Sequence, residues 1–233
     1  MSDLSDRDGS IPENKEVVVV WSGGLDSTSL IAMMIKDYTC SVYPLFINRG
    51  QGNYRFEKIA IDHYNDIFLQ QFGLYHQYCE IEVPIPPNQF KKGLPKRYTH
   101  VMQISDIINQ AVRYALTLDA DTILIGTIPS DRRGNSNNVT LKYFVSKTNE
   151  VRLGTDKPSL QVLAPFLLLH YNKREIIAWS SSNGLDLSKT RSCVGNRPEP
   201  CGECDACKSR SEAFNQQFYN SNRSHDKTRT VEA

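Results

Sequence analysis

The chain has 233 residues, of which 39% are hydrophobic and 23% charged, an ordinary composition for a globular protein with one main core. Because 27 basic side chains face 26 acidic ones, net charge gives no argument for binding to nucleic acid or to a membrane surface. The sequence contains neither a signal-peptide pattern nor an apolar run of the roughly 20 residues that a membrane helix needs. We therefore expect a cytoplasmic protein.

Strand and helix patterns alternate along the first part of the chain, after a polar leader over residues 1–15 that we expect to be flexible. The β-branched run 16–21 is typical of a strand buried on both faces, and the apolar stretch 27–37 is typical of a buried helix. A second strand is predicted at 41–47, a helix at 54–72 and a third strand at 78–83. Pro44 is unfavourable inside its strand.

A long loop follows, because the segment 84–100 contains four prolines that regular structure does not accept. The clearest amphipathic helix of the chain is predicted around 104–118, where apolar residues recur at three- and four-residue spacing. The later elements are a strand at 121–126, a loop at 127–138, a strand at 160–166, a helix at 173–183 and a polar tail at 216–233.

This alternation predicts an α/β fold with a doubly wound parallel sheet, in a domain that spans residues 16–185. In such sheets ligands bind beyond the carboxyl ends of the strands. The loops that follow Trp21, Ile47 and Gly126 are therefore where we expect a functional site.

The segment 17–28, VVVVWSGGLDST, runs from a buried strand into two glycines, an acid and three hydroxyl residues. Gly23 and Gly24 remove side chains where backbone amides would approach a ligand, and the following helix presents unpaired N–H groups. Hydroxyl donors come from Ser22, Ser27 and Thr28. The turn therefore predicts a phosphate cradle. The alternative is a tight turn between strand and helix in which Ser27 is only the N-cap.

This turn lacks the lysine of the Walker P-loop, so a cation must neutralise the phosphates, and Asp26 is the expected anchor for Mg²⁺. The string SGGLDST resembles the PP-loop signature of ATP pyrophosphatases, which cleave ATP to AMP and pyrophosphate. On this resemblance the nucleotide pocket is assigned to Trp21, Ser22, Gly23, Gly24, Leu25, Asp26, Ser27, Thr28 and Gly126.

Four of the six cysteines crowd near the C-terminus, in the pattern Cys193-x7-Cys201-x2-Cys204-x2-Cys207. In a reducing compartment such a cluster indicates metal ligation rather than disulfides. Four thiolates are what a closed structural zinc site takes, so we expect one Zn²⁺ per chain in the segment 186–215. An iron–sulfur cluster is the competing use of clustered thiolates.

A PP-loop near one end and this cysteine pattern near the other resemble the QueC family, the 7-cyano-7-deazaguanine (preQ0) synthases, over residues 16–214. Further positions agree with family motifs: Gly50-Gln51 with Glu57, Gly126, Asp131 and Gly134, Lys173 and Glu175, Thr190 and Ser192, and the string CGECDACKSR.

Departures from the family pattern lie in the middle of the chain. Where the family has F-D-Y-G-Q-R-H, the residues 47–53 read INRGQGN. Residues 101–104 replace the family's P-G-R-N, and residues 135–139 replace its Y-P-D-C-R. The phosphate and cysteine ends thus agree with the family, whereas the substrate half differs.

The resemblance implies a PP-loop enzyme of queuosine biosynthesis, an ATP-dependent carboxylate–nitrogen ligase. A 7-deazaguanine-type carboxylate would be adenylated with release of pyrophosphate, and a nitrogen nucleophile, which is ammonia in preQ0 synthesis, would displace AMP. It assigns catalysis to Asp26, Lys173 and Asp131, and substrate contact to Arg49, Gln51 and Asp131. Gly126 would let the adenosine approach the sheet edge.

The expected partners are ATP and a small-molecule carboxylate, in a homodimer that binds neither nucleic acid nor membrane. Two alternatives stay open beside preQ0 synthesis. A paralogue from an antiphage defence operon would join the carboxylate to an amine on a protein acceptor, and the altered middle of the chain suits this idea. A catalytically inactive relative would only bind nucleotide, although the intact SGGLDST argues against that.

Overall fold

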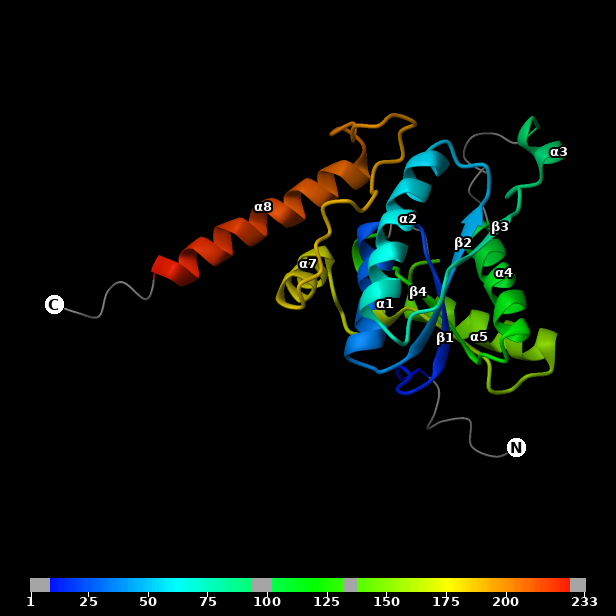
Figure 1. The fold of residues 1–233 in the computed structure, drawn as a ribbon. Coiled ribbons are helices and arrows are strands. Elements are labelled where there is room, and N and C mark those ends of the chain that lie inside the picture. The colour runs from blue at the N-terminus through cyan, green and yellow to red at the C-terminus, as the bar shows by residue number, and fades with distance from the viewer. Residues whose placement is uncertain (1–8, 94–101, 132–137, 227–233) are drawn as a thin grey trace.

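The structure is a computed structural model that describes residues 9–93, 102–131 and 138–226, with side chains described up to residue 215. A five-stranded, fully parallel sheet forms its centre, in the order β3-β2-β1-β4-β5 (Figure 1). The strands are β1 Glu16–Val20, β2 Ser41–Asn48, β3 Cys79–Glu82, β4 Thr122–Ile125 and β5 Gln161–Leu163.

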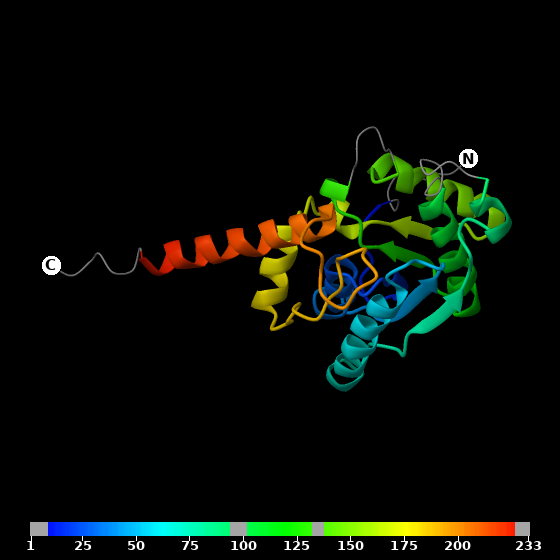
Figure 2. The same ribbon diagram turned by 90° about the horizontal axis from the view of Figure 1, so that it is seen from above.

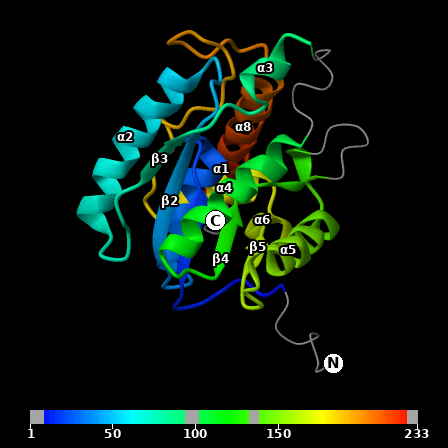
Figure 3. The same cartoon turned by 90° about the vertical axis from the view of Figure 1, so that its right-hand side faces the viewer.

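Both faces of the sheet are covered, which explains why β1 reads as an unbroken apolar run. Val17 and Val19 pack into one hydrophobic cluster, and Val18 packs into the other. The first cluster includes residues of α1 Leu25–Lys36, α2 Tyr54–Gln71 and α7 Lys173–Ser182. The second includes residues of α4 Gln103–Thr117 and α5 Leu141–Thr155 (Figures 1 and 3). The predicted doubly wound α/β fold is confirmed.

The strand order places a switch point at the centre of the sheet. From β1 the chain winds outward through β2 to β3, and then returns to β4 on the other side of β1. Loops that leave the carboxyl ends of β1 and β4 therefore diverge, and a crevice between them is the usual ligand position in such sheets. Trp21 follows β1 and Gly126 follows β4, so both lie at this point.

The boundaries of several predicted elements differ from the structure. The strand predicted at 160–166 ends at Leu163, because Pro165 begins the short helix α6 Pro165–Leu168. A one-turn helix, α3 Asn88–Lys91, lies within the predicted loop 84–100, and α5 occupies a stretch for which no element was predicted. In the loop 127–138, Pro129–Asp131 form a 3-10 turn and residues 132–137 lie outside the described ranges.

Pro44 does lie inside β2, and the pairing shows why it is tolerated. Val42 forms an isolated bridge with Tyr75, and the regular ladder with β3 begins only at Leu45. Pro44 falls between the two. Its nitrogen faces the same edge of β2 as the Val42 N–H, which bonds to Leu74 ahead of β3, so the missing N–H of Pro44 interrupts no ladder.

Parts of the predicted leader and tail lie within the described ranges and form regular contacts or structure. Ile11 of the predicted leader packs against the first core cluster, and the Pro12 carbonyl oxygen lies 3.2 Å from the Cys40 sulfur. The helix α8 Asp205–Asp226 continues through the boundary predicted between cysteine segment and polar tail, and it projects from the body of the fold (Figure 2). In the described ranges, no helix is both long and apolar enough to cross a bilayer.

Aromatic side chains fill the space behind the end of β1. Phe68 is fully buried, and its ring centroid lies 6.3 Å from that of Trp21 and 5.4 Å from that of Tyr75. Trp21 itself is 1% exposed and directly precedes the glycine turn. The packing of α2 thus supports the start of the loop that we expect to bind phosphate.

Replacing Phe68 with alanine should lower the free energy of unfolding by about 3–5 kcal/mol, because the change leaves a cavity among buried rings. The neighbouring Leu69, which is 44% exposed, offers a matched control, and Leu69→Ala should cost less than about 1 kcal/mol. Urea unfolding measures both values. Equal losses in the two variants would contradict the packing described for this face.

Candidate functional site

The two glycines of the turn bring its backbone against other parts of the chain. Gly23 has a φ of +67°, and a Cβ atom there would lie 2.7 Å from the carbonyl oxygen of Glu57 in α2. Gly24 is the N-cap of α1, and a Cβ there would lie 3.4 Å from the carbonyl oxygen of Arg191. A side chain at Gly23 would therefore both strain the backbone and push the turn off α2.

The helix α1 begins at Leu25, so Ser27 lies in its first turn and is not the N-cap. Among the described residues, no side chain caps this end of α1. The first N–H groups of the helix, with its partial positive charge, are therefore available to an anion.

The hydroxyl groups of the turn have different roles. Thr28 is fully buried, and its Oγ1 accepts a hydrogen bond of 2.9 Å from Trp21 Nε1, so it supports the turn from behind rather than facing a ligand. Ser27 is 6% exposed, and its Oγ accepts a hydrogen bond from the Ser22 N–H at 3.2 Å. Leu25 is buried in the core. The partly exposed residues are Ser22, Gly24 and Asp26.

An ion pair lies at the end of this turn. Lys173 Nζ lies 3.3 Å from Asp26 Oδ2, and the two side chains are only 12% and 20% exposed. Burial raises the pKa of Asp26 to about 6, although the Lys173 ammonium opposes this rise. The other oxygen, Oδ1, is buried and has no hydrogen-bond partner in the part of the chain that the structure describes.

A buried carboxylate oxygen without a partner is costly, and a hard cation is the ligand that such an oxygen suits. The charge of Asp131 also acts on Asp26 and raises its pKa, so a second acid lies within electrostatic range. Asp131 is oriented by its own turn, since its Oδ2 accepts a hydrogen bond of 3.0 Å from the Ile128 N–H. These residues therefore fit a magnesium ion.

Lys173 is positioned by the start of α7. Asn172 is the N-cap, and its side chain accepts hydrogen bonds from the N–H groups of Arg174 and Glu175. The Glu175 side chain accepts the Asn172 N–H in return, at 2.7 Å, which completes a capping box. The resemblance assigned a role to Lys173, and the cap explains why this lysine projects from a fixed helix end.

Gly126 lies directly against the N-terminus of α1. A Cβ atom on it would be 3.0 Å from the Cα and 3.1 Å from the backbone N of Ser27. Its small size therefore lets β4 and α1 approach closely, a reason that the sequence alone did not provide. The expectation that Gly126 also admits the adenosine stays a prediction.

Gln51 and Arg49 lie in the loop after β2. Gln51 is engaged at both ends of its amide: Oε1 accepts from the Arg49 N–H at 2.8 Å, and Nε2 donates to Glu57 Oε2 at 2.7 Å. Arg49 Nε is buried and has no hydrogen-bond partner among the described residues. A Cβ atom on Gly50 would lie 3.5 Å from Lys91 Nζ, so a second cation lies beside this loop.

The four predicted metal ligands do come together. The sulfur atoms of Cys193, Cys201, Cys204 and Cys207 all lie within 4.8 Å of one another. A tetrahedral site with metal–sulfur distances of about 2.3 Å needs sulfurs about 3.8 Å apart, so the cluster fits such an ion after small shifts.

Backbone amides donate to the sulfur atoms of Cys193 and Cys201, two of the four in the cluster. The Cys204 N–H lies 3.3 Å from the Cys201 sulfur and lowers the pKa of that thiol to about 6. The Cys193 sulfur receives the N–H groups of Gly195 and Cys201, both at 3.3 Å. The donor set is that of a thiolate-bound metal.

The sequence analysis assigned no role to the residues that join the turn, α2 and the cysteine segment. Glu57 is 6% exposed and holds Gln51 and Asn53 by hydrogen bonds of 2.7 and 2.9 Å. Arg191 is 9% exposed and bonds to the segment between the first two cysteines. Glu57 was named as a position that agrees with a family motif but received no role, whereas Arg191 carries no motif or periodic signal.

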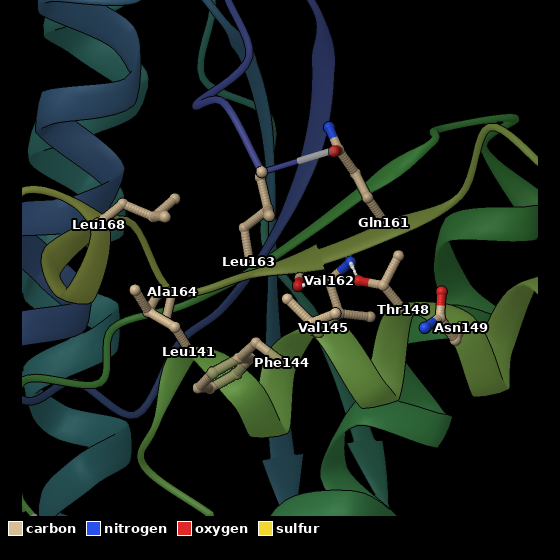
Figure 4. A pocket seen from close by; sticks show the side chains of 11 residues that line it. Leu141, Phe144, Val145, Thr148, Asn149, Gln161, Val162, Leu163, Ala164 and Leu168 are labelled. Carbon is tan, nitrogen blue, oxygen red and sulfur yellow. Dashed lines mark hydrogen bonds between the residues drawn. The ribbon is translucent and has the colours of Figure 1, made fainter. Parts of the chain in front are cut away.

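An apolar cavity of about 220 Å³ lies elsewhere, at the β5 edge of the sheet between α5, β5 and α6 (Figure 4). Phe144, Val145 and Leu163 are among its lining residues. None of the predicted phosphate, substrate or metal residues lines it, so it is separate from the site described here.

Comparison with known proteins gives the family. The sequence model described as "Queuosine biosynthesis protein QueC" matches residues 16–218. The 7-cyano-7-deazaguanine synthase of Pseudoalteromonas atlantica is 26% identical over 214 residues, which cover 86% of this chain and 94% of that protein. The synthase of the same name from Nautilia profundicola is 28% identical over 215 residues, with coverages of 86% and 93%.

Among solved structures, the U34-tRNA thiolase NcsA from Methanococcus maripaludis is 16% identical, with a TM-score of 0.49 over 89% of this chain and 68% of that one. The match of the family model extends over most of the chain and includes both the glycine turn and the four cysteines. The chain therefore belongs to the QueC family of queuosine biosynthesis proteins.

Proposed function

We propose that this protein uses ATP to activate a 7-deazaguanine-type carboxylate as its adenylate and then couples the acyl group to a nitrogen nucleophile. The observation that carries the proposal is the half-satisfied Asp26 carboxylate beside Lys173, at the open end of a glycine turn whose helix is uncapped. Membership of a family whose curated relatives are 7-cyano-7-deazaguanine synthases supports the class of substrate.

In this proposal the phosphates of ATP lie on the turn. Backbone N–H groups from Gly24 into the first turn of α1 hold the phosphate oxygens, and the Ser22 hydroxyl adds a donor. Asp26 would hold Mg²⁺, which neutralises the phosphate charge when bound. Lys173 stabilises the negative charge that grows on the leaving pyrophosphate.

The chemistry consists of two displacements. An oxygen of the substrate carboxylate attacks the α-phosphorus, and the bond from that phosphorus to the bridging oxygen breaks, so that pyrophosphate leaves with the electron pair. A neutral ammonia or amine then attacks the carbonyl carbon of the acyl-adenylate, AMP leaves, and the nitrogen loses a proton. Activation is needed because a free carboxylate is a poor electrophile, whereas AMP is a good leaving group.

The carboxylate itself requires a cationic contact, which we assign to Arg49 with Lys91 nearby. Arg49 Nε is buried without a partner, and Lys91 Nζ approaches the same loop from α3. Both lie beyond the carboxyl end of β2, on the same edge of the sheet as the glycine turn. Asp131 is assigned to the substrate from the β4 side of that edge.

We further propose that the four cysteines hold one structural Zn²⁺. Four thiolates fill a tetrahedral coordination shell, so the ion has no open position for chemistry. The stretch from Thr190 to Cys201 contains neither helix nor strand and has little core of its own, which is the usual reason for a metal in such a position.

An amine on a protein acceptor, as in the antiphage defence paralogues, is a second candidate for the nucleophile. One surface feature favours it: α3 exposes Phe90, with 57% of its surface free, next to Lys91. A protein acceptor would give this exposed ring a contact, whereas ammonia would not. Mass spectrometry of the products formed from ATP, ammonia and 7-carboxy-7-deazaguanine separates the two, since only a preQ0 synthase completes the nitrile.

Asp26→Asn should lower the rate of pyrophosphate release by about 100-fold or more, because it removes the charge that anchors the cation. Urea unfolding shows whether the variant stays folded, since the change also removes the ion-pair partner of Lys173. Asp66→Asn, an exposed change on α2, is the control and should keep the wild-type rate. Wild-type turnover in Asp26→Asn would exclude this residue from the site.

Arg49→Met should raise the KM for 7-carboxy-7-deazaguanine by about tenfold or more, because a charge-assisted hydrogen bond contributes about 1.5–3 kcal/mol. The KM for ATP should change by less than about twofold, since the phosphate turn is untouched. Arg55→Met, which removes an exposed arginine of α2, should change neither constant. An equal rise in both KM values would assign Arg49 to the fold rather than to the substrate.

Elemental analysis should find about one zinc per chain, and Cys204→Ser should lose both the metal and part of the urea stability. Cys79→Ser is the control, because Cys79 lies in β3 outside the cluster, and it should keep the metal. A brown protein that contains iron and acid-labile sulfide would refute zinc and favour the iron–sulfur alternative.

A further inference from the structure

Arg191 is a buried arginine, and in the part of the chain that the structure describes its side chain contacts the cysteine segment and one aromatic ring. Its guanidinium makes four hydrogen bonds, and all four acceptors are backbone carbonyl oxygens. They belong to Cys193 at 3.1 Å, Pro198 at 2.9 Å, and Gly195 and Arg197 both at 2.8 Å. The side chain thus holds the backbone of the segment between Cys193 and Cys201, the first two proposed metal ligands.

The main chain of the same residue contacts the phosphate turn. The Arg191 N–H donates to the Gly23 carbonyl oxygen at 2.8 Å, and the Arg191 carbonyl oxygen lies against Gly24. The guanidinium carbon also lies 4.8 Å from the centre of the Phe56 ring in α2, which limits how the side chain can move. One residue therefore connects the metal segment with the two glycines.

A second connection runs in parallel. Asn53 Nδ2 donates to the Cys193 carbonyl oxygen at 3.3 Å and to Glu57 Oε1 at 2.9 Å. The backbone carbonyl of Glu57 is the group that faces Gly23. The backbone carbonyl of Cys193, a proposed metal ligand, thus accepts hydrogen bonds from both Arg191 and Asn53. Arg191 contacts the glycine turn directly, whereas Asn53 reaches it through Glu57.

We propose that Arg191 is a positioning residue that couples the metal segment to the phosphate turn, so that metal binding and nucleotide binding strengthen each other. Metal ligation by Cys193 and Cys201 fixes the carbonyls between them, these carbonyls fix the guanidinium, and the backbone of Arg191 then holds Gly23 in its left-handed conformation. This inference rests on the proposed function, because it takes the turn to be the nucleotide site. Coupling between two binding sites is reciprocal, which makes it measurable from either side.

The experiment measures the dissociation constant of zinc from the intact holoprotein, by competition with a chromophoric chelator. It is done with and without α,β-methylene-ATP and Mg²⁺, a nucleotide that cannot be cleaved between its α- and β-phosphates. In the wild type, saturating nucleotide should tighten zinc binding about fivefold or more, the lower range of measured couplings between sites. An unchanged zinc constant in a wild-type protein that binds the nucleotide would overturn the proposal.

Arg191→Met keeps the length of the side chain and removes the four donors, while Arg197→Met makes the same change at an exposed arginine of the same segment. Both should carry one zinc per chain. Arg197→Met should keep the wild-type coupling, whereas Arg191→Met should show no effect of nucleotide on zinc and about tenfold weaker binding of the nucleotide. Wild-type coupling in Arg191→Met would also overturn the proposal.

Two further measurements separate other outcomes. If Arg191→Met does not fold, Arg191→Lys, which retains a charge but not the fork of donors, should show reduced coupling, and full coupling in it would count against the arginine. If the wild type binds no nucleotide, the proposed function fails. The dissociation constant of zinc without nucleotide then still tests the role of Arg191. Arg191→Met should weaken zinc binding at least about fivefold more than Arg197→Met does, and equal constants in the two variants would refute the role.

Discussion

The left-handed turn at Gly23 is the constraint on which the rest of the site depends. Its φ of +67° and its contact with the Glu57 carbonyl admit only glycine, and this conformation turns the chain from β1 into α1 with the amides on the open side. The other side of the turn is held by α2 and by Arg191. The cysteine segment, far along the chain, is therefore part of what shapes this turn.

The electrostatics of the site follow from this arrangement. Asp26 sits in the first turn of α1, where the helix dipole favours an acid, yet burial raises its pKa to about 6 and Lys173 satisfies only one of its oxygens. A carboxylate in that condition is stabilised by gaining a cation. We infer that the pocket is completed by magnesium nucleotide, and that Arg49 and Lys91 are the cationic side chains that meet the substrate.

Sequence patterns predicted the parts of this account that are local. The run 17–28 contains its strand, its turn and its helix start in twelve consecutive residues, and the four cysteines lie within fifteen. What the sequence did not predict depends on contacts between distant residues. Arg191 bonds to Gly23 although nearly the whole sheet domain separates the two in sequence. Thr28 is fully buried and accepts a hydrogen bond from Trp21, which the motif alone did not indicate. The need for glycine at position 126 is likewise explained by the close approach of α1.

Exchange of labelled pyrophosphate into ATP tests the central claim most directly, because it reports reversible adenylation without any nitrogen nucleophile. With 7-carboxy-7-deazaguanine and Mg²⁺ present, the wild-type protein should incorporate label into ATP, and omission of the acid should abolish the incorporation. Label that enters ATP equally well without the acid, or fails to enter at all while ATP is bound, would contradict the proposal that this turn activates a carboxylate.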